Sequence, residues 1–248
     1  MNDPKVYILS RPVLDKAALE SFLKDNDVSW LPSKNATDAE HICEISGRIC
    51  YLSFTDDSEK IHHPNDQYLR HIIKQGHESV LEHVSWTFII DRVSRAFSHQ
   101  LVRHRVGFSY SQLSQQYHDE QDAEFVEPIG LDEDGQKIWE NYVSMAKSTY
   151  KKLLERTDAK DKPSKERLRQ IRSAARSVLP NATETKLSVT ANARALRHFF
   201  ITRGTIIGDL EMRVVACKLH EALVKEAPAL FGDIKVQMWN DGHPIIQL

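Results

Sequence analysis

The sequence predicts an α+β fold in a single domain over residues 1–248, with a mixed or antiparallel sheet flanked by helices. Strand-like segments are few and do not alternate with helices as βαβ units, which argues against a doubly wound parallel sheet. No GxGxxG motif is present, so no dinucleotide-binding fingerprint supports such a sheet. No internal repeat, low-complexity tract or convincing linker divides the chain, and 248 residues can bury a substantial core.

The expected strands have β-branched or alternating apolar residues. The first is apolar and ends before Arg11 and Pro12, and another places Val84, Trp86 and Phe88 on one face. We expect strands at residues 5–10, 84–92, 107–111 and 183–191.

The expected helices show apolar residues at spacings of three and four, with polar residues at their starts. Thr37, for example, is placed to cap a helix whose core-facing residues include Ile45. The long helix at 137–156 is expected to turn Ile138, Tyr142, Met145 and Leu153 inward. We expect helices at residues 14–23, 38–51, 65–74, 137–156, 165–178, 192–203 and 209–225, another from Ser94, and polar connections at 54–64 and 157–165.

Composition excludes several classes of function. Hydrophobic residues make up 41% and charged residues 27% of the chain, as in ordinary globular proteins. The formal net charge of −2 gives no global attraction to nucleic acid or to an acidic membrane surface, so we expect neither as a partner. The opening MNDPKVYILSRP lacks the basic start and long apolar run of a leader, and no window approaches a membrane span. We expect a cytoplasmic protein.

Cysteine usage gives no sign of a disulfide framework or a metal site. The three cysteines, Cys43, Cys50 and Cys217, lie far apart without CxxC spacing. Cys217 fits a buried small apolar position in the helix at 209–225. We therefore expect no metal.

Residues 98–120 (SHQLVRHRVGFSYSQLSQQYHDE) are the stretch most suggestive of a binding site. Arg103 and Arg105 flank His104, and hydroxyls and amides follow without an acidic residue until Asp119. Guanidinium groups bind phosphate esters through paired donors, and neutral donors complete such a site. The alternative is a solvated basic helix end, which does not explain why Ser114 and its neighbours are so rich in hydroxyls and amides.

A second stretch, GHESVLEH at residues 76–83, superficially resembles a zinc protease motif. That motif needs histidines four apart on one helix face, whereas His77 and His83 are six apart and Leu81 stands at the ligand position. The metalloprotease interpretation is rejected. What remains is a cluster of polar side chains, including Ser79 and Glu82, just before a strand.

A third stretch, residues 192–203 (NARALRHFFITR), places an arginine on an apolar face. As a helix it aligns Arg203 with Leu196 and Phe199. Such an arginine either extends to solvent or pairs with a buried anion. The structural alternative is an ion pair with Asp209 or Glu211.

Together these stretches resemble one family. The RHR triplet followed after eight residues by Ser114, with GHESVLEH before it and ARSVLP (175–180) and NARALRHFFITR after it, is similar to the flavin-dependent thymidylate synthases. The match runs from about residue 48 to residue 231. The resemblance implies a ThyX-like fold and conversion of dUMP to dTMP, with carbon from methylenetetrahydrofolate and reducing equivalents from NADPH through FAD. It also implies no cysteine nucleophile, and a homotetramer with active sites shared between subunits.

The resemblance assigns roles residue by residue. Arg203 would be catalytic, contacting the pyrimidine and stabilising negative charge as C5 is activated, a task suited to a preorganised cation. FAD would be held by Ser79, Glu82, Arg103, His104, Arg105, Gln112, Asn192, Ala193, Arg194 and His198. The nucleotide would contact Gln100, Leu101, Val102, Arg103, Gln112, Leu113, Ser114, Gln115, Gln116, Arg176 and Arg203.

The chain departs from the family pattern at three positions near the expected ligands, one of which is Gln112, where an acidic residue is common. Gln116 stands where an arginine is usual, and Arg172 and Arg176 are candidates to replace it. Cys50 stands where many members have serine. Two alternative functions remain: C5 methylation of another pyrimidine nucleotide such as UMP, and a non-catalytic nucleotide- or nucleic-acid-binding module built on the triplet.

Overall fold

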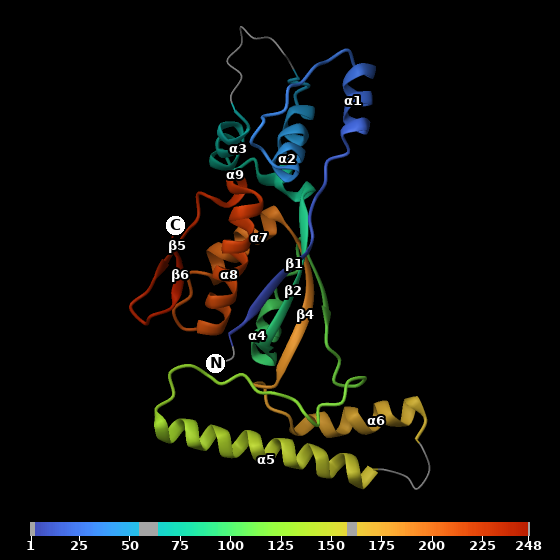
Figure 1. Ribbon diagram of the computed structural model, residues 1–248, viewed down its shortest axis with the longest axis vertical. Helices are drawn as coiled ribbons and strands as arrows, with labels where there is room; N and C mark the ends of the chain where they lie inside the picture. Colours follow the sequence, from blue (N-terminus) through green and yellow to red (C-terminus); the bar gives the residue numbers. More distant parts are fainter. Residues whose placement is uncertain (1–2, 55–63, 158–162, 248) are drawn as a thin grey trace. The chain divides into compact units, whose positions relative to one another are not determined.

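The computed structural model describes residues 3–54, 64–157 and 163–247, and it confirms the α+β class (Figure 1). The connections expected at 54–64 and 157–165 fall mostly outside the described residues. The strands are β1 Lys5–Ser10, β2 Ser85–Ser94, β3 Phe108–Gln112, β4 Glu184–Asn192, β5 Lys235–Met238 and β6 Pro244–Gln247. The helices are α1 Lys16–Asp25, α2 Asp38–Ile49, α3 Asn65–Lys74, α4 Arg95–Leu101, α5 Glu133–Thr157, α6 Lys165–Ala175, α7 Ala193–Arg203, α8 Leu210–Glu226 and α9 Pro228–Phe231, with 3-10 turns η1 Glu78–His83 and η2 Arg176–Val178.

Four of these strands form one sheet in the order β1-β2-β4-β3, and β5 and β6 form a separate antiparallel pair. The chain divides into two compact units. The first holds residues 1–5, 90–103 and 110–188, and the second holds residues 6–89, 104–109 and 189–248. The expectation of a single domain stays a prediction.

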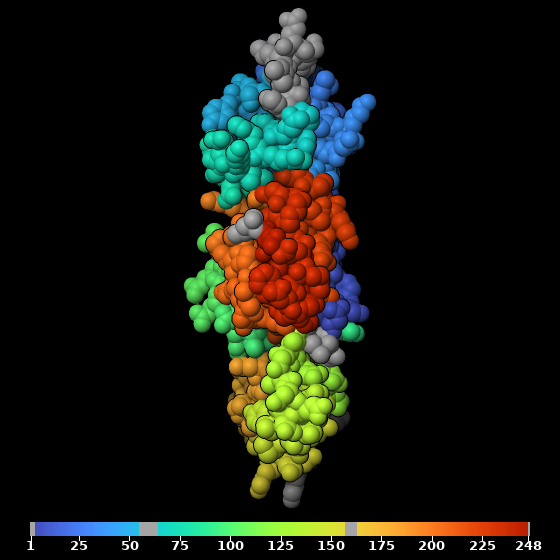
Figure 2. All heavy atoms as spheres, turned by 90° about the vertical axis from the view of Figure 1, so that its left-hand side faces the viewer, coloured from blue at the N-terminus to red at the C-terminus, as the bar shows by residue number. Residues whose placement is uncertain are grey.

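In the second unit an aromatic core packs around the C-terminal helices. Phe231 makes edge contacts with Trp86 and Phe200, at ring-centroid distances of 5.7 and 5.9 Å. Figure 2 shows α3 (teal) directly against the C-terminal segment (red). A buried hydrogen bond of 2.6 Å from the Ala229 amide to a carboxylate oxygen of Glu40 ties α9 to α2.

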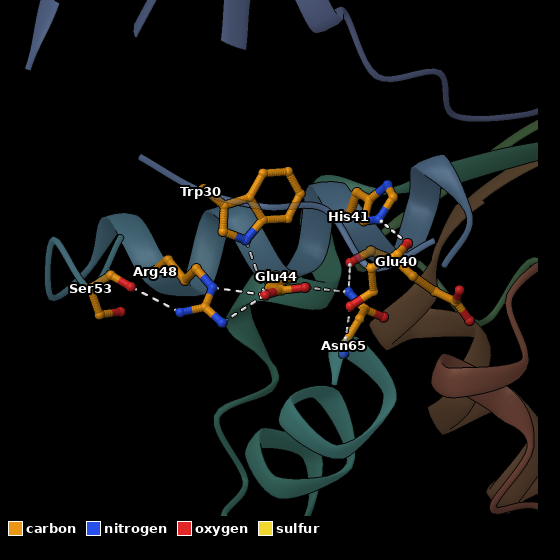
Figure 3. A network of polar contacts seen from close by, with 8 residues as sticks. Trp30, Glu40, His41, Glu44, Arg48, Ser53 and Asn65 are labelled. Carbon is orange, nitrogen blue, oxygen red and sulfur yellow. Dashed lines mark hydrogen bonds and ion pairs between the residues drawn. The ribbon is translucent and has the colours of Figure 1, made fainter. Parts of the chain in front are cut away.

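The same unit contains a buried polar network centred on Glu44 of α2 (Figure 3). One carboxylate oxygen accepts hydrogen bonds from Trp30 Nε1 (3.2 Å) and Arg48 Nε (2.8 Å), and the other accepts from Asn65 Nδ2 (2.6 Å). Arg48 also donates to the Ser53 carbonyl at 2.9 Å. A buried charge is tolerated only when it is paired and hydrogen-bonded, and this network meets that requirement for both Glu44 and Arg48.

In the first unit, α5 packs against α6, but with a different face inward than the sequence predicted. Ile138, Tyr142 and Met145 are 72%, 48% and 61% exposed, so their expected burial was wrong. Helix α5 carries two apolar stripes, and the one facing the protein includes Val143 and Tyr150. The Tyr150 hydroxyl accepts a hydrogen bond from the Glu120 amide, which favours this face because it satisfies a buried backbone donor.

Helix α5 also begins four residues before the predicted start. Asp132 Oδ1 accepts a hydrogen bond from the Gly135 amide at 2.8 Å, which is the geometry of a helix cap. Residues 133–136 are therefore the first turn of the helix rather than part of the preceding connection. Among the described residues, no helix combines the length and apolar character needed to cross a bilayer.

Candidate functional site

A glycine turn holds the segment after the basic triplet close to the start of α7. Gly107 has φ +72°, and a Cβ at this position would lie 2.7 Å from Cβ of Ala195 and 2.8 Å from Nδ2 of Asn192. The backbone N–H of Asn192 donates a hydrogen bond to the Gly107 carbonyl at 3.1 Å. Both the positive φ and the close approach require glycine. Gly107 is thereby fixed against the N-terminal end of α7, and His104 and Arg105 precede it by three and two residues.

A pocket of about 350 Å³ opens at this end of α7. Asn192 caps the helix, its Oδ1 accepting a hydrogen bond from the Ala195 amide at 2.8 Å. Ala193 is fully buried, so it contributes packing rather than a side-chain contact to the pocket. The pocket is lined by Glu78, Glu82, Val106, Asn192, Arg194, Ala195 and His198, four of which the sequence assigned to the cofactor.

Arg194 lies between two carboxylates at the edge of this pocket. Its guanidinium donates to Glu82 at 2.5 Å and approaches Glu78 at 3.7 Å. All three side chains are at least a third exposed, so these pairs add little stability, and a ligand can displace them at small cost. A neighbouring pocket of about 370 Å³ shares Glu78 and Arg194 and is also lined by Ser79 and Cys50.

His104, the centre of the triplet, contacts Arg203 at the other end of α7. Nε of Arg203 donates to Nε2 of His104 at 2.9 Å. Burial and the neighbouring cation Arg203 lower the pKa of His104, with a smaller contribution from His198. Asp209, one of the two carboxylates considered as partners for Arg203, instead caps α8 through the Met212 amide.

Apart from Arg203, the expected nucleotide residues lie in the first unit, where Gln112 has a structural role. Its Nε2 donates to Ser98 Oγ at 2.8 Å and to Thr185 Oγ1 at 3.3 Å. The Leu113 amide donates to the Lys186 carbonyl at 3.1 Å, which extends the pairing beyond β3. These contacts hold the start of a turn at residues 114–118, called the Ser114 turn. The Ser114 carbonyl accepts a hydrogen bond from the His118 backbone amide at 2.8 Å.

Three arginines contact this turn, and a fourth, Arg176, lies near one of them, Arg95. Arg95 donates to the Leu113 carbonyl at 2.7 Å and Arg172 to the Tyr117 carbonyl at 2.7 Å. Arg169 donates to Gln116 Oε1 at 3.2 Å, while its guanidinium lies over the Tyr117 ring, 5.4 Å from the centroid. Arg176, on η2, is half-buried.

Arg95 carries the clearest sign of an anion site. The pKa of Arg95 is lowered mainly by burial. The carboxylate of Glu120 raises this pKa, and the like charge of Arg176 lowers it further. Its buried Nε has no hydrogen-bond partner within the described part of the chain. Two neighbouring cations, one with an unsatisfied buried donor, favour a bound anion.

The comparisons with known proteins agree with the sequence resemblance. The family model described as thymidylate synthase complementing protein matches residues 34–229. The flavin-dependent thymidylate synthase of Mycobacterium avium (strain 104) is 44% identical over 233 residues, which cover 92% of each chain. The enzymes of the same name from Mycobacterium bovis (strain BCG / Pasteur 1173P2) and Mycobacterium tuberculosis (strain ATCC 25177 / H37Ra) are 43% identical over the same share. The chain belongs to this family of enzymes.

The residues expected from the family fall into two groups. Ser79, Glu82, His104, Arg105, Asn192, Ala193, Arg194, His198 and Arg203 belong to the second unit, whereas Gln100, Leu101, Val102, Arg103, Gln112, Leu113, Ser114, Gln115, Gln116 and Arg176 belong to the first. Arg103 and Arg105 are exposed, while Gln115 is 7% and Leu101 is 1% exposed. Their individual roles stay predictions.

Two arginines near the Ser114 turn, Arg95 and Arg169, have no role that the sequence predicts. Arg95 precedes the triplet by eight residues, and Arg169 lies on the same helix as Arg172. Spacing alone does not distinguish them from solvated arginines. The informative signal was Gln116, because an amide in place of a usual arginine calls for a guanidinium from elsewhere, and the structure offers Arg169.

Proposed function

We propose that the protein converts dUMP to dTMP, taking carbon from methylenetetrahydrofolate and reducing equivalents from NADPH through FAD. The observation that carries this proposal is the pocket at the start of α7, which gathers Glu82, Asn192, Arg194 and His198 from two distant stretches of sequence. The family resemblance assigns each of these four residues to the cofactor. Family membership supports flavin-dependent thymidylate synthesis in general.

The residues around this pocket suit FAD. The cofactor combines an anionic diphosphate with aromatic rings, and the pocket offers the guanidinium group of Arg194 and the exposed apolar Val106. Ser79 lines the adjoining pocket and supplies a hydroxyl. When bound, FAD would transfer the reducing equivalents that turn the one-carbon unit into a methyl group.

Cations of the first unit would bind the phosphate of the nucleotide. Arg95 donates to the Leu113 carbonyl beside the Ser114 turn, and Arg176 is close enough to lower the pKa of Arg95, so the two cations can neutralise a phosphate. Activation of C5 places negative charge on the pyrimidine oxygens, and Arg203 would stabilise that charge. Its position at the end of a buried helix makes it a preorganised donor.

We also propose that no cysteine acts as a nucleophile. Burial raises the pKa of the Cys43 and Cys217 thiols to about 12, so neither forms a thiolate at neutral pH. Cys50 is exposed and donates to the Ser46 carbonyl at 3.4 Å. No base among these contacts would activate it.

The active enzyme would be a cytoplasmic homotetramer with shared active sites and with no nucleic acid or membrane as partner. Support for self-association comes from the α5 stripe, defined as Ile138, Tyr142 and Met145, which is exposed on a helix of 25 residues. These residues follow the alternating spacing of four and three that is typical of a seam between helices.

The first test is a visible absorption spectrum of the purified protein after loading with FAD and desalting. We expect retained flavin bands that bleach on anaerobic addition of NADPH, and a spectral change on addition of dUMP. Competition by UMP would test the alternative substrate, since a pocket closed against the 2′-hydroxyl excludes UMP. A colourless protein would refute the cofactor assignment and favour a binding module that retains nucleic acid at low salt.

A complementation experiment tests shared active sites. Arg176→Ala and Arg194→Ala alter different predicted groups, and each variant alone should be inactive. If a site takes residues from more than one subunit, co-expressed chains will form some intact sites and recover activity. Absence of recovery in a proven mixed assembly would contradict sharing between these two groups.

A further inference from the structure

We propose that His104 is a positioning residue: its neutral imidazole accepts the Nε proton of Arg203 and thereby orients the guanidinium toward the nucleotide. The proposal rests on the proposed role of Arg203 and gives His104 a task besides contact with FAD. It concerns residues of a single compact unit.

The contact has an unusual chemical form. Arg203 donates to a neutral nitrogen acceptor at 2.9 Å rather than presenting its Nε–H to water. Arginine cannot accept a hydrogen bond, so Nε2 of His104 must carry the lone pair and Nδ1 the proton. Because Nε is engaged, the four N–H groups on the terminal nitrogens remain for a ligand.

Aromatic neighbours fix the plane of the imidazole. The His104 ring makes an edge contact with Phe199 at 5.1 Å and a tilted contact with Phe108 at 5.9 Å. Phe199 is fully buried on α7, four residues before Arg203. The same helix therefore positions both the ring that holds His104 and the arginine that His104 holds.

The surroundings also keep the imidazole neutral. Helix α7 presents Arg203 and His198 to the ring, and both lower the pKa of His104 together with burial. Protonation would remove the acceptor and place a second cation against Arg203. Because the folded-state pKa lies below the ordinary value of 6.5, the hydrogen bond persists above that lowered pKa and is lost as the pH falls through it.

A double-mutant cycle on the FAD-loaded enzyme tests the proposal. The dissociation constant of radiolabelled dUMP would be measured by equilibrium dialysis for the wild type, His104→Ala, Arg203→Ala and the double variant. We expect Arg203→Ala to weaken binding roughly 10- to 100-fold, as for loss of one charge-assisted hydrogen bond. His104→Ala should weaken it by a smaller factor, and the double variant should bind no worse than Arg203→Ala. If the double variant weakens dUMP binding by the product of the two single factors, the residues act independently and the proposal is overturned.

The pH profile separates positioning from a general structural role. The affinity of the wild type for dUMP should decrease as the pH falls through the lowered pKa of His104. The amide oxygen of His104→Gln accepts a hydrogen bond at every pH, so this variant should bind dUMP more tightly than His104→Ala, with an affinity that does not decrease at low pH. His71→Gln changes an exposed histidine of α3 and is the matched control. Flavin content would be measured in each variant. If the affinity of His104→Gln for dUMP decreases at low pH as it does in the wild type, the proposal is contradicted.

A measurement without ligand keeps this inference distinct from the proposed function. Nitrogen NMR of protein labelled at histidine should show the Nδ1–H tautomer of His104 and a pKa below 6.5 that rises in Arg203→Ala. If the protein fails to bind dUMP yet gives this NMR result, dUMP is refuted as the substrate, while the hydrogen bond between Arg203 and His104 is supported. If the pKa of His104 has its ordinary value and does not change in Arg203→Ala, the positioning role is overturned whatever the substrate.

Discussion

Cys50 is the cysteine best placed to test a mechanism without an enzyme nucleophile. It lines a pocket next to the expected flavin site and stands where many family members have serine. Cys50→Ser keeps a small side chain that can donate to the Ser46 carbonyl. We therefore expect unchanged turnover, measured as dTMP formed from dUMP in the presence of folate and NADPH. Abolished turnover in a variant that still binds FAD would show that the thiol takes part in the reaction.

Arg169 is expected to replace the guanidinium that is missing at position 116. Gln116 accepts its Nε–H and donates to Ser173, which together hold the arginine beside the Ser114 turn. We expect Arg169→Ala to weaken dUMP binding about tenfold or more, the loss of one charge-assisted contact. Equilibrium dialysis provides the measurement.

The control for this experiment lies on the same helix. Arg167 is exposed and donates to the nearby Gln170, so Arg167→Ala removes an equal charge away from the turn. If both variants lose affinity equally, the effect comes from general electrostatics and Arg169 has no specific contact.

Motifs shared with the family identified candidate site residues in the sequence. Asn192 and Arg194 both belong to NARALRHFFITR, and both line the pocket, while their contact with the cofactor stays a prediction. The role of Gln112 as a link to Ser98 and Thr185 was not predictable, because its partners are 14 and 73 residues away. Tertiary hydrogen bonds of this kind leave no periodic trace in the chain.

At the scale of elements, the network centred on Glu44 should dominate the stability of the α2–α3 pair. Glu44→Ala leaves Arg48 buried without its carboxylate, and such losses cost about 3–5 kcal/mol. Urea unfolding followed by circular dichroism measures this change. Arg70→Ala removes an exposed pair with Asp66 and should cost at most about 1 kcal/mol. Equal costs would show that the network does not govern this packing.

Elements with a single apolar stripe were predicted well, and α5 shows why others were not. The capping of α2 by Thr37 and the burial of Cys217 on α8 follow the sequence pattern. Helix α5 has two stripes of similar hydropathy, and its inward face depends on contacts such as Tyr150 with Glu120. The short strands β5 and β6 also escaped prediction, since four residues give too little periodicity to recognise.

At the scale of the whole molecule, the charges on α5 match a second copy running antiparallel. The first turn carries Glu133 and Asp134, whereas the last two turns carry Lys151, Lys152 and Arg156. An antiparallel pair about a two-fold axis between Tyr142 and Met145 would bring the acidic first turn of one copy close to this basic segment of another. Acidic and basic ends then lie opposite each other, which favours this pairing over a parallel one.

Met145→Lys should therefore weaken assembly, because it places a charge in the centre of the α5 stripe, where desolvating it is costly. Sedimentation velocity should show a smaller species than the wild type at equal concentration, with unchanged helical content by circular dichroism. Ser144→Lys adds the same charge to an exposed neighbouring position outside the stripe and should leave the mass unchanged. If Met145→Lys keeps the wild-type mass, the stripe is not an interface between copies of this chain.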